Sequence, residues 1–246
     1  MTSFTPHTFQ VDTFTVEDAS IFTYRLSPHK PRKDNLTAVI LHGGGQATNS
    51  TSYDAFAQLF ANNGVAVISI DFVGHGKTGG SMTDNSLVLR ERHALAAIQH
   101  WVAPEVPLVL IGFSMSGHTV MCLTATLGKR VQHLGLFCPA TYAIEAENIN
   151  FGSDFSKILR TPDSWRTSQG LANLANFTGR TLLVTGAHDD VVDWEITSEM
   201  ITRAKANSRE VRVEIIGSRD HHLVRWMSEH PAFSEQLVRY FVEDEL

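Results

Sequence analysis

The chain has few cysteines and no long apolar run, and each absence excludes a class of protein. Among its 246 residues are only two cysteines, too few for a disulfide framework or a cysteine-based metal site. We expect both, Cys122 and Cys138, to be small core residues. No apolar run approaches the ~20 residues of a membrane-spanning helix, and residues 1–4 lack the basic and apolar segments of a secretion signal. These features predict a soluble, cytoplasmic protein that does not bind membranes.

Runs of basic residues are also missing. The formal net charge is −6 and no segment concentrates lysine or arginine, so a nucleic-acid partner is not expected. Segments 188–190 and 221–222 contain metal-ligand side chains, but adjacent histidines do not easily share one ion, and no His-Glu-x-x-His pattern occurs. The segment 74–78 ends like a phosphate loop but lacks the required earlier glycine. We therefore predict neither a metal nor another cofactor.

What the chain has is an alternation of short apolar runs and amphipathic segments. A hydrophobic content of 43% can form a substantial core, and we expect residues 1–246 to form a single domain. The first two predicted strands form an antiparallel hairpin at the sheet edge, and the later strands alternate with helices. This pattern predicts an α/β fold with a mostly parallel central sheet and helices on both faces. The predicted strands are 8–16, 20–27, 36–41, 65–70, 109–113, 131–137, 181–185 and 211–216, and the predicted helix faces fall within 53–60, 87–101, 120–127, 196–204 and 233–241.

One segment interrupts this alternation. Residues 140–178 contain no strand-like apolar run and are longer than an ordinary connection. Their apolar side chains suffice to pack short helices over another surface. We interpret the segment as a short lid insertion within the domain.

The chemistry is expected where residues 109–117 turn from an apolar strand into a helix. Ser114 occupies that corner, at the carboxyl end of a buried strand. A serine there projects toward solvent while the first amides of the helix point at the group it attacks. The alternative is a serine that only caps the helix.

Loops that follow other strands carry further motifs at the same edge of the sheet. They are His42-Gly43-Gly44-Gly45, residues 71–80, residues 186–190, and residues 217–222 after the last strand. The chain thus resembles an α/β-hydrolase of the serine-hydrolase, lysophospholipase- and carboxylesterase-like branch over nearly its whole length. Residues 41–44 resemble the oxyanion loop, 71–76 the Asp-x-x-Gly-His-Gly turn, 112–115 the nucleophile elbow, 186–189 the acid turn and 219–223 the histidine segment.

The resemblance implies a role for each matching residue. Ser114 would be the nucleophile, His221 its general base and Asp189 the acid that orients the histidine ring. The backbone N–H groups of Gly44 and Met115 would form the oxyanion hole. Contacts with substrate are expected from Gly45 and from two lid aromatics, Phe155 and Trp165.

Several alternatives stay open at the level of sequence. His222 can replace His221 as the base. Asp190 or Asp193, or Glu145 or Glu147 after the preceding strand, can replace Asp189. His42 and His75 are expected to support the site by bonding to backbone. His118 and His188 are expected to be satisfied by neighbouring groups.

The elbow departs from the family at one position. The usual pattern is G-x-S-x-G, but Ser116 occupies the second glycine position and the glycine follows at Gly117. Because a side chain there occupies space where helix and strand approach closely, we expect a displaced helix start or a locally bonded hydroxyl. The same departure keeps open a non-catalytic protein that binds a small ligand.

The favoured function is hydrolysis of a carboxylic ester or thioester of a small to medium acyl substrate through an acyl-serine intermediate. Lactone, amide and carbon–carbon bond hydrolysis use the same constellation of residues and remain alternatives. The expected partner is a small-molecule acyl substrate. A homodimer is compatible with the sequence.

Overall fold

The structure, a computed structural model, describes residues 7–217 and 220–243. Ser218 and Arg219, which belong to the predicted histidine segment, lie outside these ranges. In the described part of the chain, eight strands form one sheet in the order β1-β2-β4-β3-β5-β6-β7-β8. The strands are β1 Thr8–Val16, β2 Ala19–Ser27, β3 Thr37–Leu41, β4 Ala66–Ile70, β5 Leu108–Phe113, β6 Val131–Phe137, β7 Arg180–Gly186 and β8 Glu210–Ile216.

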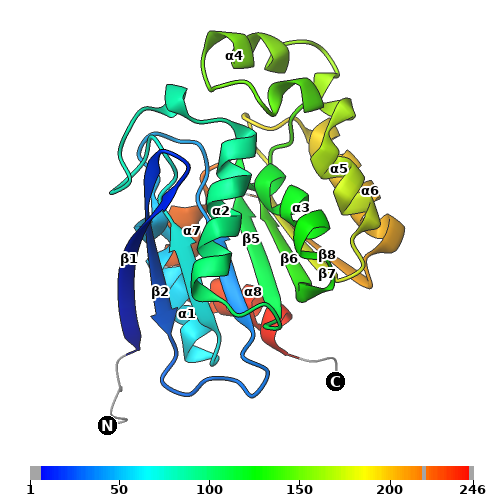
Figure 1. Cartoon of the computed structure of the whole chain (residues 1–246). Coiled ribbons are helices and arrows are strands. Elements are labelled where there is room, and N and C mark those ends of the chain that lie inside the picture. The colour runs from blue at the N-terminus through cyan, green and yellow to red at the C-terminus, as the bar shows by residue number, and fades with distance from the viewer. Residues whose placement is uncertain (1–6, 218–219, 244–246) are drawn as a thin grey trace.

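The sheet combines an antiparallel edge with a parallel body. β1 pairs antiparallel with β2, and β2 pairs antiparallel with β4, whereas every pairing from β4 through β3 to β8 is parallel. β3, β4 and β5 are buried along their whole length, as their nearly continuous apolar sequences require. β1 is mostly exposed, which fits its position at the edge (Figure 1). The predicted fold class, with its N-terminal hairpin, is confirmed.

Helices cover both faces of the sheet and enclose two apolar cores (Figure 1). Side chains of α1, α7 and α8 contribute to one core, and those of α2, α3, α5 and α6 contribute to the other. The helices are α1 Asp54–Asn62, α2 Leu87–Trp101, α3 Ser116–Leu127, α4 Ser153–Leu159, α5 Gln169–Asn176, α6 Trp194–Asn207, α7 Leu223–Glu229 and α8 Pro231–Val242. Short 3-10 helices are η1 Ser50–Tyr53, η2 Met82–Asp84, η3 Gly128–Arg130, η4 Ile144–Ala146 and η5 Ser164–Thr167. No helix in residues 7–217 or 220–243 combines the length and apolar character needed to cross a membrane.

Residues 140–178 contain short helices and no strand, as the sequence indicated. In Figure 1 the part around α4 projects beyond the body of the molecule, whereas α5 lies beside α3 and α6. α4 contributes Phe155 to a small separate apolar cluster with Leu87, Tyr142, Ala146 and Phe151. α5 instead contributes Leu171 and Leu174 to the core under α2 and α3. The part of the segment around α4 therefore projects from the molecule, whereas α5 belongs to the core.

Candidate active site

Ser114 lies at a strained turn between β5 and α3. Its backbone has φ +51°, a left-handed conformation that non-glycine residues seldom adopt. The turn is held by backbone bonds: Ser114 N–H donates to the Phe137 carbonyl at 2.9 Å, and the Ser114 carbonyl accepts from Gly117 and Ala140. A Cβ on Gly112 would lie 2.2 Å from the Ser116 carbonyl oxygen, so only glycine fits there. This close approach of β5 and α3 directs the Ser114 side chain out of the sheet.

The serine, histidine and aspartate that were predicted from separate loops lie in one hydrogen-bonded chain. Ser114 Oγ is 2.7 Å from His221 Nε2. On the other side of the ring, His221 Nδ1 is 2.9 Å from Asp189 Oδ2 and 3.1 Å from Oδ1. These contacts require Nδ1 to carry the hydrogen that Asp189 accepts, which leaves the Nε2 lone pair facing the serine.

Asp189 is fixed by more than the histidine. Its Oδ1 accepts hydrogen bonds from the backbone N–H groups of Val191 and Val192 at 3.0 and 2.9 Å. Burial raises the pKa of this carboxyl, but the bonds from His221, Val192 and Val191 outweigh burial and lower the pKa below its usual range. Asp189 is thus charged where it meets the imidazole. The alternative base, His222, lines the same cavity but forms no hydrogen bond with Ser114 or Asp189 in the described part of the chain.

The loop after β3 lies against the serine. A Cβ on Gly43 would lie 3.1 Å from Ser114 Cβ, and a Cβ on Gly44 would lie 2.8 Å from the end of the Met115 side chain. Gly44 and Met115 are therefore neighbours in space. Among the described residues, neither of their N–H groups donates a hydrogen bond to another protein group. Both donors are available to a ligand atom beside Ser114.

His42 supports this loop. Its Nδ1 is 2.7 Å from the Gly43 carbonyl, and its Nε2 accepts the Phe72 N–H at 3.1 Å. Burial lowers the pKa of His42 well below its usual value, and Arg90 and His75 lower it further, so the ring is neutral. The supporting bonds to backbone that the sequence predicted for His42 are present.

The Ser116 hydroxyl forms its hydrogen bonds with residues of other elements and not within its own turn. Its Oγ donates to the His42 carbonyl at 2.6 Å and accepts from Arg90 Nη2 at 2.8 Å. Arg90 Nη2 also donates to the His42 carbonyl, at 2.7 Å. The expectation of a locally bonded hydroxyl is corrected, because the His42 carbonyl in the loop after β3 and the Arg90 guanidinium both lie within reach of the side chain.

Arg90 itself is fully buried on α2, with no carboxylate partner in the described part of the chain. Its guanidinium stacks on the Phe72 ring, 3.7 Å from the ring centre. Burial lowers the pKa of Arg90 to about 9, so the group keeps its charge at neutral pH. Sequence reasoning missed this residue. The signal was present, because Arg90 lies three residues after Leu87 and four before Ala94 on the predicted apolar face of the helix.

A cavity of about 830 Å³ opens beside Ser114. It extends between α1 and the α7–α8 region, and its walls are mostly apolar. Besides Ser114, Gly43–Gly45, Met115, His221 and His222, the lining includes Tyr53, Ala55, Phe56, Leu59, Phe113, Phe137, Tyr142, Leu223, Val224 and Met227. The sequence did not single out this wall, because α7 was not predicted.

The three residues expected to contact substrate lie in different places. Gly45 lines the cavity. Phe155, a residue of α4, is buried in the small apolar cluster that includes Leu87 and Tyr142. Trp165 stacks against the Arg166 guanidinium. Neither aromatic is among the residues that line the cavity. Of residues 140–178, only Tyr142 lines the cavity, and its ring packs against Phe155 of α4.

Comparison with known proteins found a relative of similar sequence and several structures of similar fold. The uncharacterized protein YfhR of Escherichia coli O157:H7 is 23% identical over 212 residues, which is 85% of this chain and 72% of YfhR. The fold is similar to that of the esterase EaEST from Exiguobacterium antarcticum, with a TM-score of 0.70 and 17% identity over 95% of this chain and 100% of that one. It is also similar to the thioesterase domain from the curacin biosynthetic pathway, with a TM-score of 0.69 and 16% identity over 94% of this chain and 99% of that domain.

A family model provides the assignment. Residues 33–161, slightly more than half of the chain, match the model of the Hydrolase_4 family, described as serine aminopeptidase, S33. The matched part includes the oxyanion loop, Arg90 and the serine elbow, whereas Asp189 and His221 lie beyond it. With the fold of its structural neighbours, this match shows that the chain belongs to the Hydrolase_4 family of α/β hydrolases.

Proposed function

We propose that the chain is a serine hydrolase that cleaves carboxylic esters or thioesters of small to medium apolar acyl groups. One observation carries this proposal: Ser114 Oγ lies 2.7 Å from His221 Nε2, whose other ring nitrogen is bonded to a charged Asp189. A serine hydroxyl is a poor nucleophile at its ordinary pKa. A neutral imidazole at this distance removes its proton as the attack occurs.

Acylation begins when Ser114 Oγ attacks the carbonyl carbon of the substrate and His221 Nε2 accepts the hydroxyl proton. Asp189 stabilises the resulting imidazolium and keeps the ring oriented. The carbonyl π electrons move to oxygen, where the Gly44 and Met115 N–H groups are positioned to donate to the oxyanion. When the bond to the leaving group breaks, His221 gives its proton to the departing alkoxide or thiolate.

Deacylation repeats the sequence with water. His221 takes a proton from a water molecule, which attacks the acyl-serine carbonyl and forms a second oxyanion in the same hole. Collapse releases the carboxylic acid, and Ser114 recovers its proton from His221. No residue outside this set is needed for the proton balance.

The cavity favours an apolar acyl group. Its wall beside the serine consists of side chains such as Phe56, Leu59 and Met227, and contact with such a wall stabilises each added methylene by about 0.8 kcal/mol. Two of the structures with a similar fold are an esterase and a thioesterase domain, which supports the same bond types. Neither neighbour is close enough in sequence to specify the substrate.

Turnover of p-nitrophenyl esters and acyl thioesters of graded chain length tests the proposal. We expect hydrolysis by the wild type and only background hydrolysis by Ser114→Ala. If wild type and variant are equal on every substrate, but mass spectrometry detects a persistent ligand without an acyl-serine adduct, the protein is a binder and not an esterase.

Covalent labelling by a fluorophosphonate tests the base separately. We expect His221→Ala to abolish labelling of Ser114 and His222→Ala to retain most of it. The neighbouring histidine is a matched control, since both rings line the cavity. The reverse result would assign the base to His222.

A further inference from the structure

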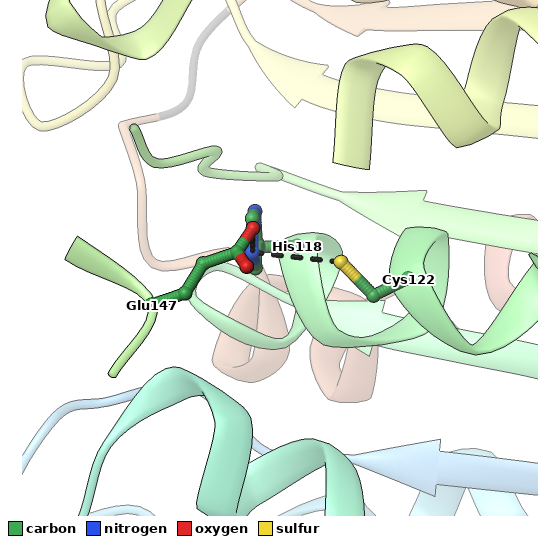
Figure 2. A group of neighbouring side chains, drawn as sticks. All are labelled: His118, Cys122 and Glu147. Atoms are coloured by element: carbon green, nitrogen blue, oxygen red, sulfur yellow. Dashed lines mark hydrogen bonds and ion pairs between the residues drawn. The ribbon is translucent and has the colours of Figure 1, made fainter. Parts of the chain in front are cut away.

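A group of side chains that can bind a metal lies at helix α3. His118 and Cys122 are one turn apart on α3, and Glu147 directly follows η4 (Figure 2). Each offers one ligand atom, and these atoms all lie within 4.8 Å of one another. His118 and Cys122 are buried, and the Glu147 side chain is 17% exposed.

Within this group one contact is a hydrogen bond to sulfur, and Glu147 Oε1 has no hydrogen bond in the described part of the chain. His118 Nε2 is 3.5 Å from Cys122 Sγ and 3.7 Å from Glu147 Oε1, and the second distance is too long for a hydrogen bond. Glu147 Oε1 is buried and has no hydrogen-bond partner. A buried carboxylate oxygen without a partner is costly. Figure 2 shows the carboxylate and the thiol both directed toward the imidazole.

The His118 ring is held in one orientation. Its Nδ1 lies 3.4 Å from Thr141 Oγ1, which is itself 2.6 Å from Ser168 Oγ. The ring packs edge-on against Tyr142, and a Cβ on Gly170 would lie 3.1 Å from Nδ1. Histidines that bind metals are usually fixed in this way, by a bond from the ring nitrogen that does not face the ion.

The surroundings are negative. Glu91 on α2 and Glu145 on η4 place further negative charge near Glu147. Among the described residues, no lysine or arginine forms an ion pair with Glu147.

We propose that His118, Cys122 and Glu147 bind a zinc ion. In a tetrahedral zinc site, ligand atoms lie about 2.0–2.3 Å from the ion and hence roughly 3.3–3.8 Å from one another. The distances from His118 Nε2 to Cys122 Sγ, 3.5 Å, and to Glu147 Oε1, 3.7 Å, fall in this range. Imidazole, thiolate and carboxylate are all zinc ligands. On binding, the Cys122 thiol releases its proton to solvent, and water occupies the fourth position.

The site would add a link between two parts of the chain that are distant in sequence. Two ligands come from α3, which begins at the serine elbow, and the third comes from residues 140–178. The Glu147 carbonyl accepts the Val88 N–H at 3.1 Å, which places the residue close to the start of α2. A bound ion would therefore attach the beginning of the inserted segment to the nucleophile helix.

Cobalt substitution tests the site, because a cobalt–thiolate bond gives a charge-transfer band and the chain has only two cysteines. We expect one equivalent of Co²⁺ to produce the band in the full-length metal-free protein. Cys122→Ser should abolish it, and Cys138→Ser should retain it. Cys138 is the matched control, since it lies in the other His/Cys/carboxylate group, with Asp189 and His221.

Each other outcome contradicts the proposal. A band that survives in Cys122→Ser and disappears in Cys138→Ser would place the ion at the candidate active site. Absence of the band in the wild type would mean that the thiol binds no cobalt. Glu147→Gln, a change on a partly exposed loop, provides a second variant if the cysteine variant does not fold.

Zinc binding measured by equilibrium dialysis completes the test without any activity assay. We expect one zinc per chain in the wild type and an affinity lower by about tenfold or more in Glu147→Gln. Zinc should also raise the Tm of the wild type but not that of Cys122→Ser. Equal zinc affinity in wild type and Glu147→Gln would overturn the ligand set.

Discussion

Arg90 donates a hydrogen bond from Nη2 to Ser116 Oγ at 2.8 Å, and this contact joins helix α2 to the first turn of α3. Both groups also bond to the His42 carbonyl, directly before the glycines of the oxyanion loop. The serine that departs from the family pattern is therefore a hydrogen-bonding partner of a buried cation. Its hydroxyl helps to hold the loop beside Ser114.

Replacing Ser116 by glycine, the residue usual in the family, should impair this protein. The change leaves the His42 carbonyl and Arg90 with one partner fewer each, and we expect a loss of about 1–3 kcal/mol in the free energy of unfolding. If the Gly44 N–H also shifts, kcat should fall about tenfold with little change in KM, because an oxyanion donor acts mainly on the transition state. Urea denaturation and ester kinetics measure the two effects.

Thr119→Val is the control for this variant. Thr119 lies on the same helix and is equally buried, but its hydroxyl has no hydrogen-bond partner. Removing that hydroxyl should leave stability and kcat nearly unchanged. Similar losses in both variants would mean that the effect of Ser116→Gly is one of helix packing and not of the bond to Arg90.

Asp189→Asn should lower kcat by up to about four orders of magnitude, as expected when the acid no longer fixes the tautomer of the catalytic histidine. The neighbouring Asp190→Asn should have little effect, because Asp190 is exposed and forms no hydrogen bond with His221 in the described part of the chain. Steady-state kinetics on one ester compares the two variants. Equal activity of Asp189→Asn and wild type would remove Asp189 from the mechanism.

Leu59→Trp should shorten the acyl chain that the protein accepts. Leu59 lines the cavity on α1, and a larger ring there reduces the space available for a long chain. Activity on octanoyl esters should fall about tenfold or more, while acetyl esters change little.

Leu159→Trp is the matched change outside the cavity. Leu159 is exposed at the end of α4, so its variant should keep the wild-type chain-length profile. A shift in Leu159→Trp and none in Leu59→Trp would assign chain-length selection to the inserted segment, as the sequence suggested through Phe155 and Trp165.

Acid should destabilise the fold through buried histidines. Burial lowers the pKa of His93 from 6.5 to about 4, and the charges of Arg90 and Arg92 contribute to the shift. Between these values the unfolded chain binds a proton that the folded chain does not, so the free energy of unfolding falls as the pH decreases from about 6.5 to about 4. At pH 5 the loss from this residue should be about 1–2 kcal/mol.

Urea denaturation at pH 7 and pH 5 measures this effect. His93→Gln should reduce the difference in unfolding free energy between the two pH values. His29→Gln, at an exposed position, should leave the difference as it is in the wild type. An unchanged difference in His93→Gln would show that other groups cause the acid sensitivity.

The sequence predicted well which strand ends carry the candidate catalytic loops, because each motif is local. A run such as β5 followed by glycine and serine determines its own turn, and parallel strands bring their carboxyl ends to one edge. The loops carrying Ser114, Asp189 and His221 therefore met as expected. The relation of Ser114 to Gly44 followed from the same topology.

Features that depend on contacts between distant side chains were not predictable. The bond from Ser116 to the His42 carbonyl joins residues 74 positions apart, and no local pattern encodes it. Helix α7 is short, with Leu223 and Met227 as its buried residues, too few for a clear helical period. The position of the cavity between α1 and α7 therefore appeared only with the fold.

The hydrogen bond between Ser114 and His221 spans 107 positions of the chain, whereas that between His221 and Asp189 spans 32. During synthesis, the turn that carries Ser114 thus leaves the ribosome long before His221 is added to the chain. A nascent chain that has folded only through β6 contains the serine turn but not the histidine. Reactivity toward a fluorophosphonate should therefore appear late in translation, after the histidine segment has emerged, and it can serve as a signal that the last part of the fold has formed.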